Sequence, residues 1–202
     1  MEDQIYEAIT RGVRKPKKNK YALFLCGASG VGKSRGSTQF LSDMKVTTTY
    51  VYINIDEIAE KFGNGQRTSG TLLPNLLMRA MKDGYSIYLN GTCRNRSFFI
   101  EHIGHLKNAG YTITFGMIYA SLNTVIKRVR DRKEQPVPES VVRDIYAHMS
   151  KNAETYMKIP DIDQIYLYTN EDTMRMIFHR NKKEVECISP KSSFYFDVSQ
   201  YC

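Results

Sequence analysis

The chain has 202 residues, of which 42% are hydrophobic and 25% are charged, as in an ordinary globular domain. A chain of this length buries a sizeable core without needing disulfides or metals. No apolar run approaches the roughly 20 residues of a membrane-spanning helix. The acidic start, Met1-Glu2-Asp3-Gln4, lacks the apolar stretch of a secretory signal. We therefore expect a cytoplasmic protein with no membrane partner.

The formal net charge of +8 calls for an anionic partner, and nucleotide phosphates, nucleic acid and an acidic protein all qualify. The densest basic run occupies residues 14–20, directly before the first predicted strand. Such a run is most often a solvated linker, with a nuclear signal and a nucleic-acid contact as alternatives.

The cysteines and histidines show no metal pattern. The four cysteines stand at positions 26, 93, 187 and 202, without a Cys-x-x-Cys pair or histidines at zinc spacing. We therefore expect a reducing compartment and no metal site built from these residues.

Strand-like runs alternate with helical patterns along most of the chain. The predicted strands are residues 21–26, 49–55, 85–90, 111–119 and 164–169. The predicted helices are residues 33–42, 71–83, 97–108, 122–132 and 139–157. This alternation predicts an α/β fold, a three-layer sandwich with a mainly parallel five-stranded sheet covered on both faces.

The ends of the chain are expected to lie outside this unit. Residues 1–20 read as a helical and basic lead-in, residues 21–170 as the main domain, and residues 171–202 as a C-terminal extension. Within the extension, residues 175–179 and 184–188 fit a hairpin, and a loosely held tail is expected beyond Ser189.

A complete P-loop pattern lies between the first predicted strand and the following helix, and reads Gly27-Ala28-Ser29-Gly30-Val31-Gly32-Lys33-Ser34. The glycines let backbone N–H groups turn toward phosphate oxygens, and the helix N-terminus adds its dipole. Lys33 is expected to reach the β- and γ-phosphates, and the Ser34 hydroxyl to bind Mg²⁺. The sequence thus predicts a P-loop NTPase fold that binds ATP with Mg²⁺, with GTP left open.

Asp56 closes the second predicted strand, on the sheet edge that also carries the P-loop. A carboxylate there suits a general base that accepts a proton from an attacking hydroxyl. Two alternatives remain. Asp56 matches the Walker B acid of motor ATPases, although only 23 residues separate it from Lys33. It also suits an N-cap for a helix that starts at Glu57.

Polar residues also follow the third predicted strand. Thr92 donates and accepts hydrogen bonds, and Arg94 can form two parallel bonds with a phosphate. With Asn90 they are the candidate substrate residues, although a plain turn is the alternative. Cys93, between them, is expected to be a bystander.

Arginines near residue 130 are candidates for charge stabilisation on a transferring phosphoryl group. Alternate residues of a helix do not share a face, so Arg128, Arg130 and Arg132 cannot all point inward. Arg128 is the first choice as a catalytic residue, and Arg132, one turn later, is the second, as a nucleotide contact.

Residues 21–169 together resemble the zeta-toxin family of P-loop kinases, and more loosely chloramphenicol phosphotransferase and polynucleotide 5′-kinases. The resemblance rests on the P-loop and on ordered pieces at residues 54–56, 82–85, 91–94, 106–111, 126–128, 137–139 and 165–170.

The resemblance implies that Lys33 and Ser34 bind ATP–Mg²⁺ and that Asp56 is the base. It also implies that Thr92 and Arg94 contact substrate and that Arg128 contacts phosphates. Known zeta toxins phosphorylate a sugar hydroxyl of UDP-N-acetylglucosamine. The chain departs from the family at Asn90, where a glutamate is typical, and near Gln135 and Pro136, where Arg130 or Arg132 must stand in for a second lid arginine.

The resulting hypothesis is a kinase that phosphorylates a hydroxyl of a nucleotide sugar or another nucleotide. The alternatives are a 5′-hydroxyl polynucleotide kinase, which the net charge favours, and a non-catalytic module that binds nucleotide or nucleic acid. An antitoxin-like inhibitor protein stays open as a partner.

Overall fold

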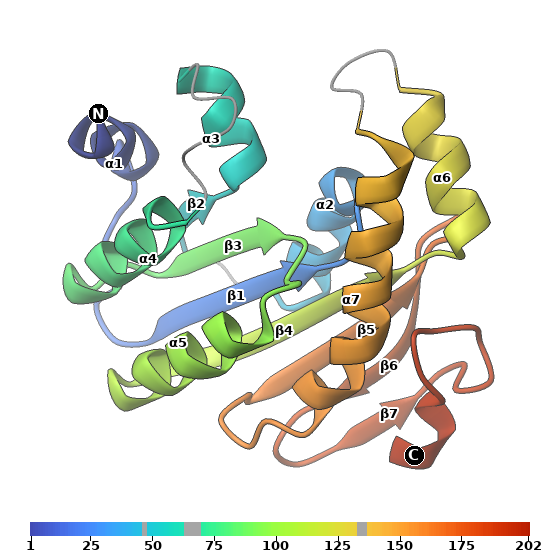
Figure 1. Cartoon of the computed structure of the whole chain (residues 1–202). Helices are drawn as coiled ribbons and strands as arrows, with labels where there is room; N and C mark the ends of the chain where they lie inside the picture. The colour runs from blue at the N-terminus through green and yellow to red at the C-terminus, as the bar shows by residue number, and fades with distance from the viewer. Residues whose placement is uncertain (46–47, 63–69, 133–136) are drawn as a thin grey trace.

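A computed structural model of the chain describes residues 1–45, 48–62, 70–132 and 137–202. Within these residues a seven-stranded sheet in the order β2-β3-β1-β4-β5-β6-β7 forms the middle layer (Figure 1). Its strands are β1 Lys20–Cys26, β2 Val51–Ile53, β3 Ile87–Gly91, β4 Tyr111–Tyr119, β5 Gln164–Thr169, β6 Arg175–Arg180 and β7 Val185–Cys187.

The predicted five parallel strands are present, as β2, β3, β1, β4 and β5. The predicted hairpin is present too, but it does not stand apart from the sheet. Its strands β6 and β7 add to the edge of β5 in antiparallel orientation, which raises the strand number from five to seven.

Helices cover both faces of the sheet. They are α1 Glu2–Thr10, α2 Lys33–Asp43, α3 Ile55–Phe62, α4 Leu72–Lys82, α5 Arg96–Asn108, α6 Leu122–Arg130 and α7 Glu139–Met157, followed by a 3-10 helix at Val198–Tyr201. Alternate residues of β1 point to opposite faces. Phe24 joins a core with α1, α4 and α5, while Leu23 and Leu25 join a second core with α2 and α6. This division confirms the three-layer sandwich.

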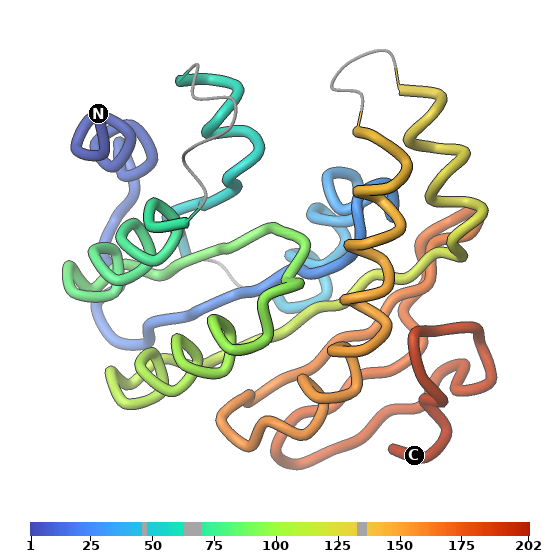
Figure 2. Tube along the Cα trace, in the orientation of Figure 1, coloured from blue at the N-terminus to red at the C-terminus, as the bar shows by residue number. Residues whose placement is uncertain are grey.

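Both ends of the chain pack against the main domain. Ile5 of α1 is fully buried, and Val198 near the C-terminus is 1% exposed in the same core. The N-terminus lies on the β2 side of the molecule and the C-terminus beside β7 (Figure 2). The expected loosely held tail is therefore wrong: burial of Val198 and a disulfide between Cys187 and Cys202 fix it.

The cysteines differ from expectation as well. All four are joined, Cys26 to Cys93 and Cys187 to Cys202. The partners are separated by 67 and 15 residues, so no local spacing in the sequence indicates the pairing.

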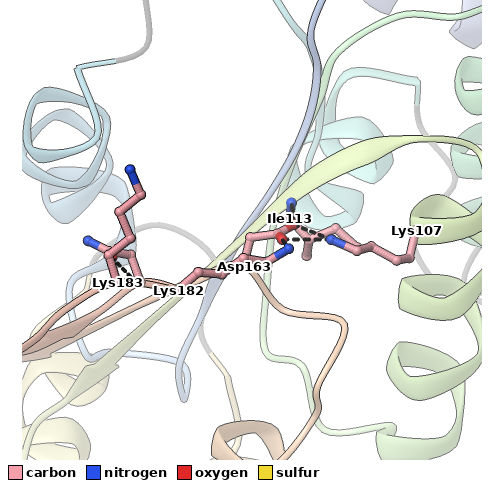
Figure 3. A network of polar contacts seen from close by, with 6 residues as sticks. Lys107, Ile113, Asp163, Lys182 and Lys183 are labelled. Carbon is pink, nitrogen blue, oxygen red and sulfur yellow. Dashed lines mark hydrogen bonds and ion pairs between the residues drawn. The ribbon is translucent and has the colours of Figure 1, made fainter.

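An ionic network connects elements at the end of the sheet opposite to the P-loop, where β5 begins. Asp163, just before β5, accepts hydrogen bonds from Lys107 Nζ at 2.6 Å and from the backbone N–H of Ile113 at 2.8 Å (Figure 3). Lys182, in the β6–β7 turn, lies 2.8 Å from the same carboxylate. The network ties the hairpin to α5 and β4. No described helix combines the length and apolar character needed to cross a membrane.

Candidate active site

The candidate site lies where three adjacent strands end. Strands β2, β3 and β1 are neighbours and run parallel, so their carboxyl ends share one edge of the sheet. The P-loop follows β1, Asn54 follows β2, and residues 92–95 follow β3. Crevices at this edge are the usual ligand sites of open α/β sheets.

Two glycines allow the P-loop to take its shape. Gly30 and Gly32 have φ angles of +89° and +95°, in the left-handed region that other residues rarely adopt. A Cβ atom on Gly30 would also lie 2.9 Å from the backbone oxygen of Val125 in α6. Helix α2 begins at Lys33, so its N-terminal N–H groups face the loop. The loop thus has the geometry of an anion-binding site.

Lys33 reaches back beneath the loop. Its Nζ donates hydrogen bonds to the backbone oxygens of Gly27 at 2.9 Å and Ala28 at 3.1 Å. Burial of the ammonium lowers the pKa of Lys33 from 10.5 to about 8, although the charge of Asp56 opposes this. A bound triphosphate would supply negative charge and favour the ammonium form.

This shift predicts a pH dependence of nucleotide binding. If only the charged form of Lys33 binds phosphates well, the ATP association constant should fall by up to roughly tenfold per pH unit above about 8. Calorimetry in buffers of different ionisation enthalpy should show proton uptake on binding near pH 8.5.

The stability of the free protein should depend on pH in the opposite direction, because the unfolded chain holds this proton up to about pH 10.5. Its unfolding free energy should therefore gain from Lys33 as pH rises from about 8 to 10.5. Binding that is independent of pH from 7 to 9.5 would contradict this interpretation.

Asp56 is not the N-cap of its helix. Helix α3 begins at Ile55, and the side-chain oxygen of Asn54 accepts from the backbone N–H groups of Asp56 at 3.1 Å and Glu57 at 3.4 Å. The capping interpretation of Asp56 is therefore wrong. Its carboxylate, in the first turn of α3, lines the cleft beside the P-loop.

Two clefts meet at Asp56. The first, which we call the loop cleft, has a volume of about 430 Å³ and is lined by Ser29, Gly30, Gly32, Lys33, Ser34, Asn54, Asp56, Glu57, Glu60, Asn90 and Arg132. The second, the adjoining cleft, has a volume of about 700 Å³. It shares Ser29, Asn54, Asp56, Asn90 and Arg132 with the first and adds Thr92, Arg94 and apolar residues of α4, α5 and α7.

Asn90 stands at the junction of the clefts with a free acceptor. It is 3% exposed, and its Nδ2 donates to the Tyr52 hydroxyl at 3.3 Å. Its Oδ1 is buried without a hydrogen-bond partner. A buried polar atom without a partner is costly, so this oxygen fits a ligand that donates or a cation.

The oxygen atoms around the loop cleft suit Mg²⁺. The Ser34 hydroxyl, the Asp56 carboxylate and Asn90 Oδ1 are hard donors of the kind this ion prefers. No group of three or more His, Cys, Asp or Glu residues able to hold a metal occurs within the described ranges. The residues therefore fit an ion carried mainly by nucleotide phosphates, which is how Mg²⁺ is usually bound.

The structure separates the two candidate arginines. Arg132 lines both clefts, while Arg128 lines neither. The Arg128 guanidinium instead donates to the backbone oxygens of Asn170 at 2.8 Å and Glu171 at 2.6 Å, in the β5–β6 connection. The structure thus places Arg132, and not Arg128, at the clefts, and the catalytic roles of both arginines stay predictions.

Exchanging each arginine for alanine should therefore give different results. Arg128→Ala removes two charged hydrogen bonds, worth roughly 1.5–3 kcal/mol each, and should lower the melting temperature by several degrees. Arg132→Ala, at an exposed position, should leave melting unchanged and cut turnover by roughly 10²-fold. Melting curves alongside single-turnover rates separate the two roles. A stable but inactive Arg128→Ala protein would restore Arg128 as the catalytic arginine.

Sequence reasoning missed residues that support the P-loop from a distance. Asn170 Nδ2 donates to the backbone oxygen of Val31 at 2.7 Å. The Tyr195 hydroxyl donates to the Ile118 oxygen at 3.2 Å and lies 3.5 Å from the Ala28 nitrogen. No local pattern signals either contact. The cap of α3 by Asn54 was missed as well, but here the sequence holds a signal, since Asn54 followed by Glu57 has the spacing of a helix start.

Comparison with known proteins gives a family and a fold. The Zeta toxin family model matches residues 6–183. A structure of the PezAT chromosomal toxin-antitoxin system of Streptococcus pneumoniae is 17% identical at a TM-score of 0.65, over 93% of this chain and 81% of that one. AvrRxo1-ORF1:-ORF2 with ATP is 12% identical at a TM-score of 0.70, over 94% of this chain and 68% of that one. No curated protein matches the sequence significantly. Because the family model spans most of the chain, this protein belongs to the Zeta toxin family.

Proposed function

We propose that this protein is a kinase that uses Mg-ATP to phosphorylate a hydroxyl of a nucleotide sugar, similar to UDP-N-acetylglucosamine, or of another nucleotide. The observation that carries the proposal is the shared wall of the two clefts. Asp56 borders both the cleft of the P-loop and the adjoining cleft. A donor phosphate and an acceptor hydroxyl placed in the two clefts would meet at this carboxylate.

Each wall residue has a role in this scheme. The N–H groups of the P-loop and Lys33 bind the triphosphate, and Ser34 helps to hold Mg²⁺, which would neutralise charge on the phosphates. Asp56 accepts the proton of the attacking hydroxyl. Arg132 stabilises charge on the transferring group, while Asn90, Thr92 and Arg94 orient the acceptor.

A panel assay tests the proposal. Labelled ATP is incubated with the protein and with nucleotide sugars, nucleotides, nucleosides or 5′-hydroxyl oligonucleotides, and Lys33→Ala serves as the control. We expect label on a nucleotide sugar or nucleotide with the wild-type protein alone. Absence of transfer to every hydroxyl tested, under conditions where ATP binds, would point to the non-catalytic module. A parallel panel with GTP establishes the donor.

A polynucleotide acceptor is the second candidate, and the net charge of +8 supports it. Salt distinguishes the two. Binding of an oligonucleotide should weaken with a log–log slope of roughly −0.7 for each phosphate contact, whereas a small acceptor should show a flatter dependence. A flat salt dependence of binding with a 5′-hydroxyl oligonucleotide acceptor would count against this candidate.

An inhibitor protein is a further proposal. It is supported by the PezAT neighbour, which comes from a toxin-antitoxin system.

A further inference from the structure

The disulfide between Cys26 and Cys93 joins the end of β1, directly before the P-loop, to the loop that follows β3. Cys26 is the last residue of β1 and directly precedes Gly27, where the P-loop begins. Cys93 lies between Thr92 and Arg94, the candidate acceptor residues. The two Cα atoms are 5.4 Å apart. A covalent bond thus connects the strand that leads into the P-loop with the loop that would hold the acceptor.

The two sulfur-bearing residues differ in access. Cys26 is fully buried at the end of β1, whereas Cys93 is 3% exposed and forms part of the wall of the adjoining cleft. A small molecule that enters this cleft therefore reaches Cys93 before Cys26. The access route is the same cleft that an acceptor would occupy.

The backbone at Cys93 has an unfavourable conformation that interactions with other parts of the chain stabilise. Its φ angle is +51°, in the left-handed region that residues with a side chain adopt at a cost. Helix α7 supplies two hydrogen bonds: the Tyr156 hydroxyl donates to the Cys93 oxygen at 2.6 Å, and Asn152 Nδ2 donates to the Arg94 oxygen at 2.8 Å. The disulfide is the third tether. Without it the loop stays attached to α7 but loses its covalent link to β1.

We propose that Cys93 is a thiol-exchange site, at which small thiols and disulfides such as glutathione react through the adjoining cleft and thereby set the position of Thr92 and Arg94. Only the expected effect on catalysis rests on the proposed function. The exchange itself and the loop movement do not.

The exchange follows ordinary thiol–disulfide chemistry. A small thiolate attacks the Cys93 sulfur, the bond to Cys26 breaks, and Cys26 leaves as a thiolate that takes up a proton. A second small thiolate then attacks the mixed disulfide and releases the Cys93 thiolate together with an oxidised small disulfide. Two thiols are oxidised and one protein disulfide is reduced, and the reverse sequence closes the bond again.

The mixed disulfide can be measured without any enzyme assay. The full chain is incubated in glutathione buffers from oxidising to reducing, quenched with N-ethylmaleimide, and mapped by mass spectrometry. We expect a peptide pair linked through Cys26 and Cys93 at the oxidising end and glutathione attached to Cys93 in between. In single variants, Cys26→Ser should acquire glutathione at Cys93, whereas Cys93→Ser should leave Cys26 unmodified. Absence of the linked pair, or modification of Cys26 as readily as Cys93, overturns the proposal.

Hydrogen exchange tests the loop movement. The amides of residues 92–95 should exchange at least roughly tenfold faster in Cys93→Ser than in the oxidised wild-type protein, because a local tether is lost. Cys187→Ser is the matched control, since its disulfide fixes the tail and not this loop. Equal exchange in Cys93→Ser and the oxidised protein would show that the bond does not position the loop.

Kinetics supply the link to the proposed function. Reduction of the wild-type protein should raise the KM for the acceptor found in the panel by roughly tenfold, because Thr92 and Arg94 would no longer be held where they orient the acceptor. The ATP KM should stay nearly unchanged. Cys187→Ser should respond to reductant as the wild type does. An unchanged acceptor KM refutes the functional consequence. If no acceptor is ever phosphorylated, the proposed function fails, while mass spectrometry and hydrogen exchange still decide the exchange site.

Discussion

Lys33→Ala should reduce phosphoryl transfer by roughly 10³-fold. The ammonium lies under the P-loop, between the oxygens of Gly27 and Ala28, where no other described side chain brings a positive charge into hydrogen-bonding distance of both. A bound triphosphate would therefore lose its main cationic partner. Single-turnover transfer of labelled phosphate at saturating Mg-ATP measures the loss.

The fold should tolerate this change. Burial disfavours the charged form of Lys33, as its lowered pKa indicates, so alanine should not lower the melting temperature. Arg35→Ala, at an exposed position two residues along α2, is the matched control and should retain near wild-type turnover. Wild-type turnover in Lys33→Ala would be incompatible with a kinase that works through this loop.

Asp56→Asn should lower the transfer rate by roughly two to four orders of magnitude, the range that general-base catalysis supplies. The amide keeps the size of the side chain but cannot accept the proton. Helix α3 should be unaffected, because Asn54 and not Asp56 caps it. Melting curves and ATP binding are expected to match the wild-type protein, and single-turnover rates report the loss.

Glu57→Gln is the comparison that isolates the base. The Glu57 carboxylate also lines the loop cleft, but it already accepts hydrogen bonds from the Tyr52 hydroxyl at 2.8 Å and Asn54 Nδ2 at 2.7 Å. Its loss should affect rate much less than the loss of Asp56. If Glu57→Gln is the slower variant, the base is Glu57 and the assignment of Asp56 is wrong.

The fold was largely predictable because its signals are local. The alternation of apolar strands and helices places β4 and β5 at the predicted residues, and α7 as well. Strand β2 is shorter than predicted, because the side chain of Asn54 starts a helix inside the predicted strand. The packed tail could not be foreseen, since Val198 gains its burial from residues far away in the chain.

The candidate site was predictable where one segment defines it. The P-loop pattern needs only its own glycines and the helix that follows, so its geometry is encoded in eight consecutive residues. Arg128 and Arg132 are four residues apart, but α6 ends at Arg130, so Arg132 lies beyond the helix and lines the clefts, while Arg128 contacts the β5–β6 connection. The bond between Cys26 and Cys93 spans 67 residues and left no local trace.

The distant supports of the P-loop have a consequence for protein synthesis. The contact from Val31 to Asn170 spans 139 residues, and that from Ala28 to Tyr195 spans 167. At ribosomal speeds of about 5–20 residues per second, these supports emerge on the order of ten seconds after the loop itself. In a growing chain the P-loop is therefore synthesised long before the residues that stabilise its conformation are available. Nucleotide binding should appear late and abruptly in translation, when the β5–β6 connection and the tail close over a loop made at the start.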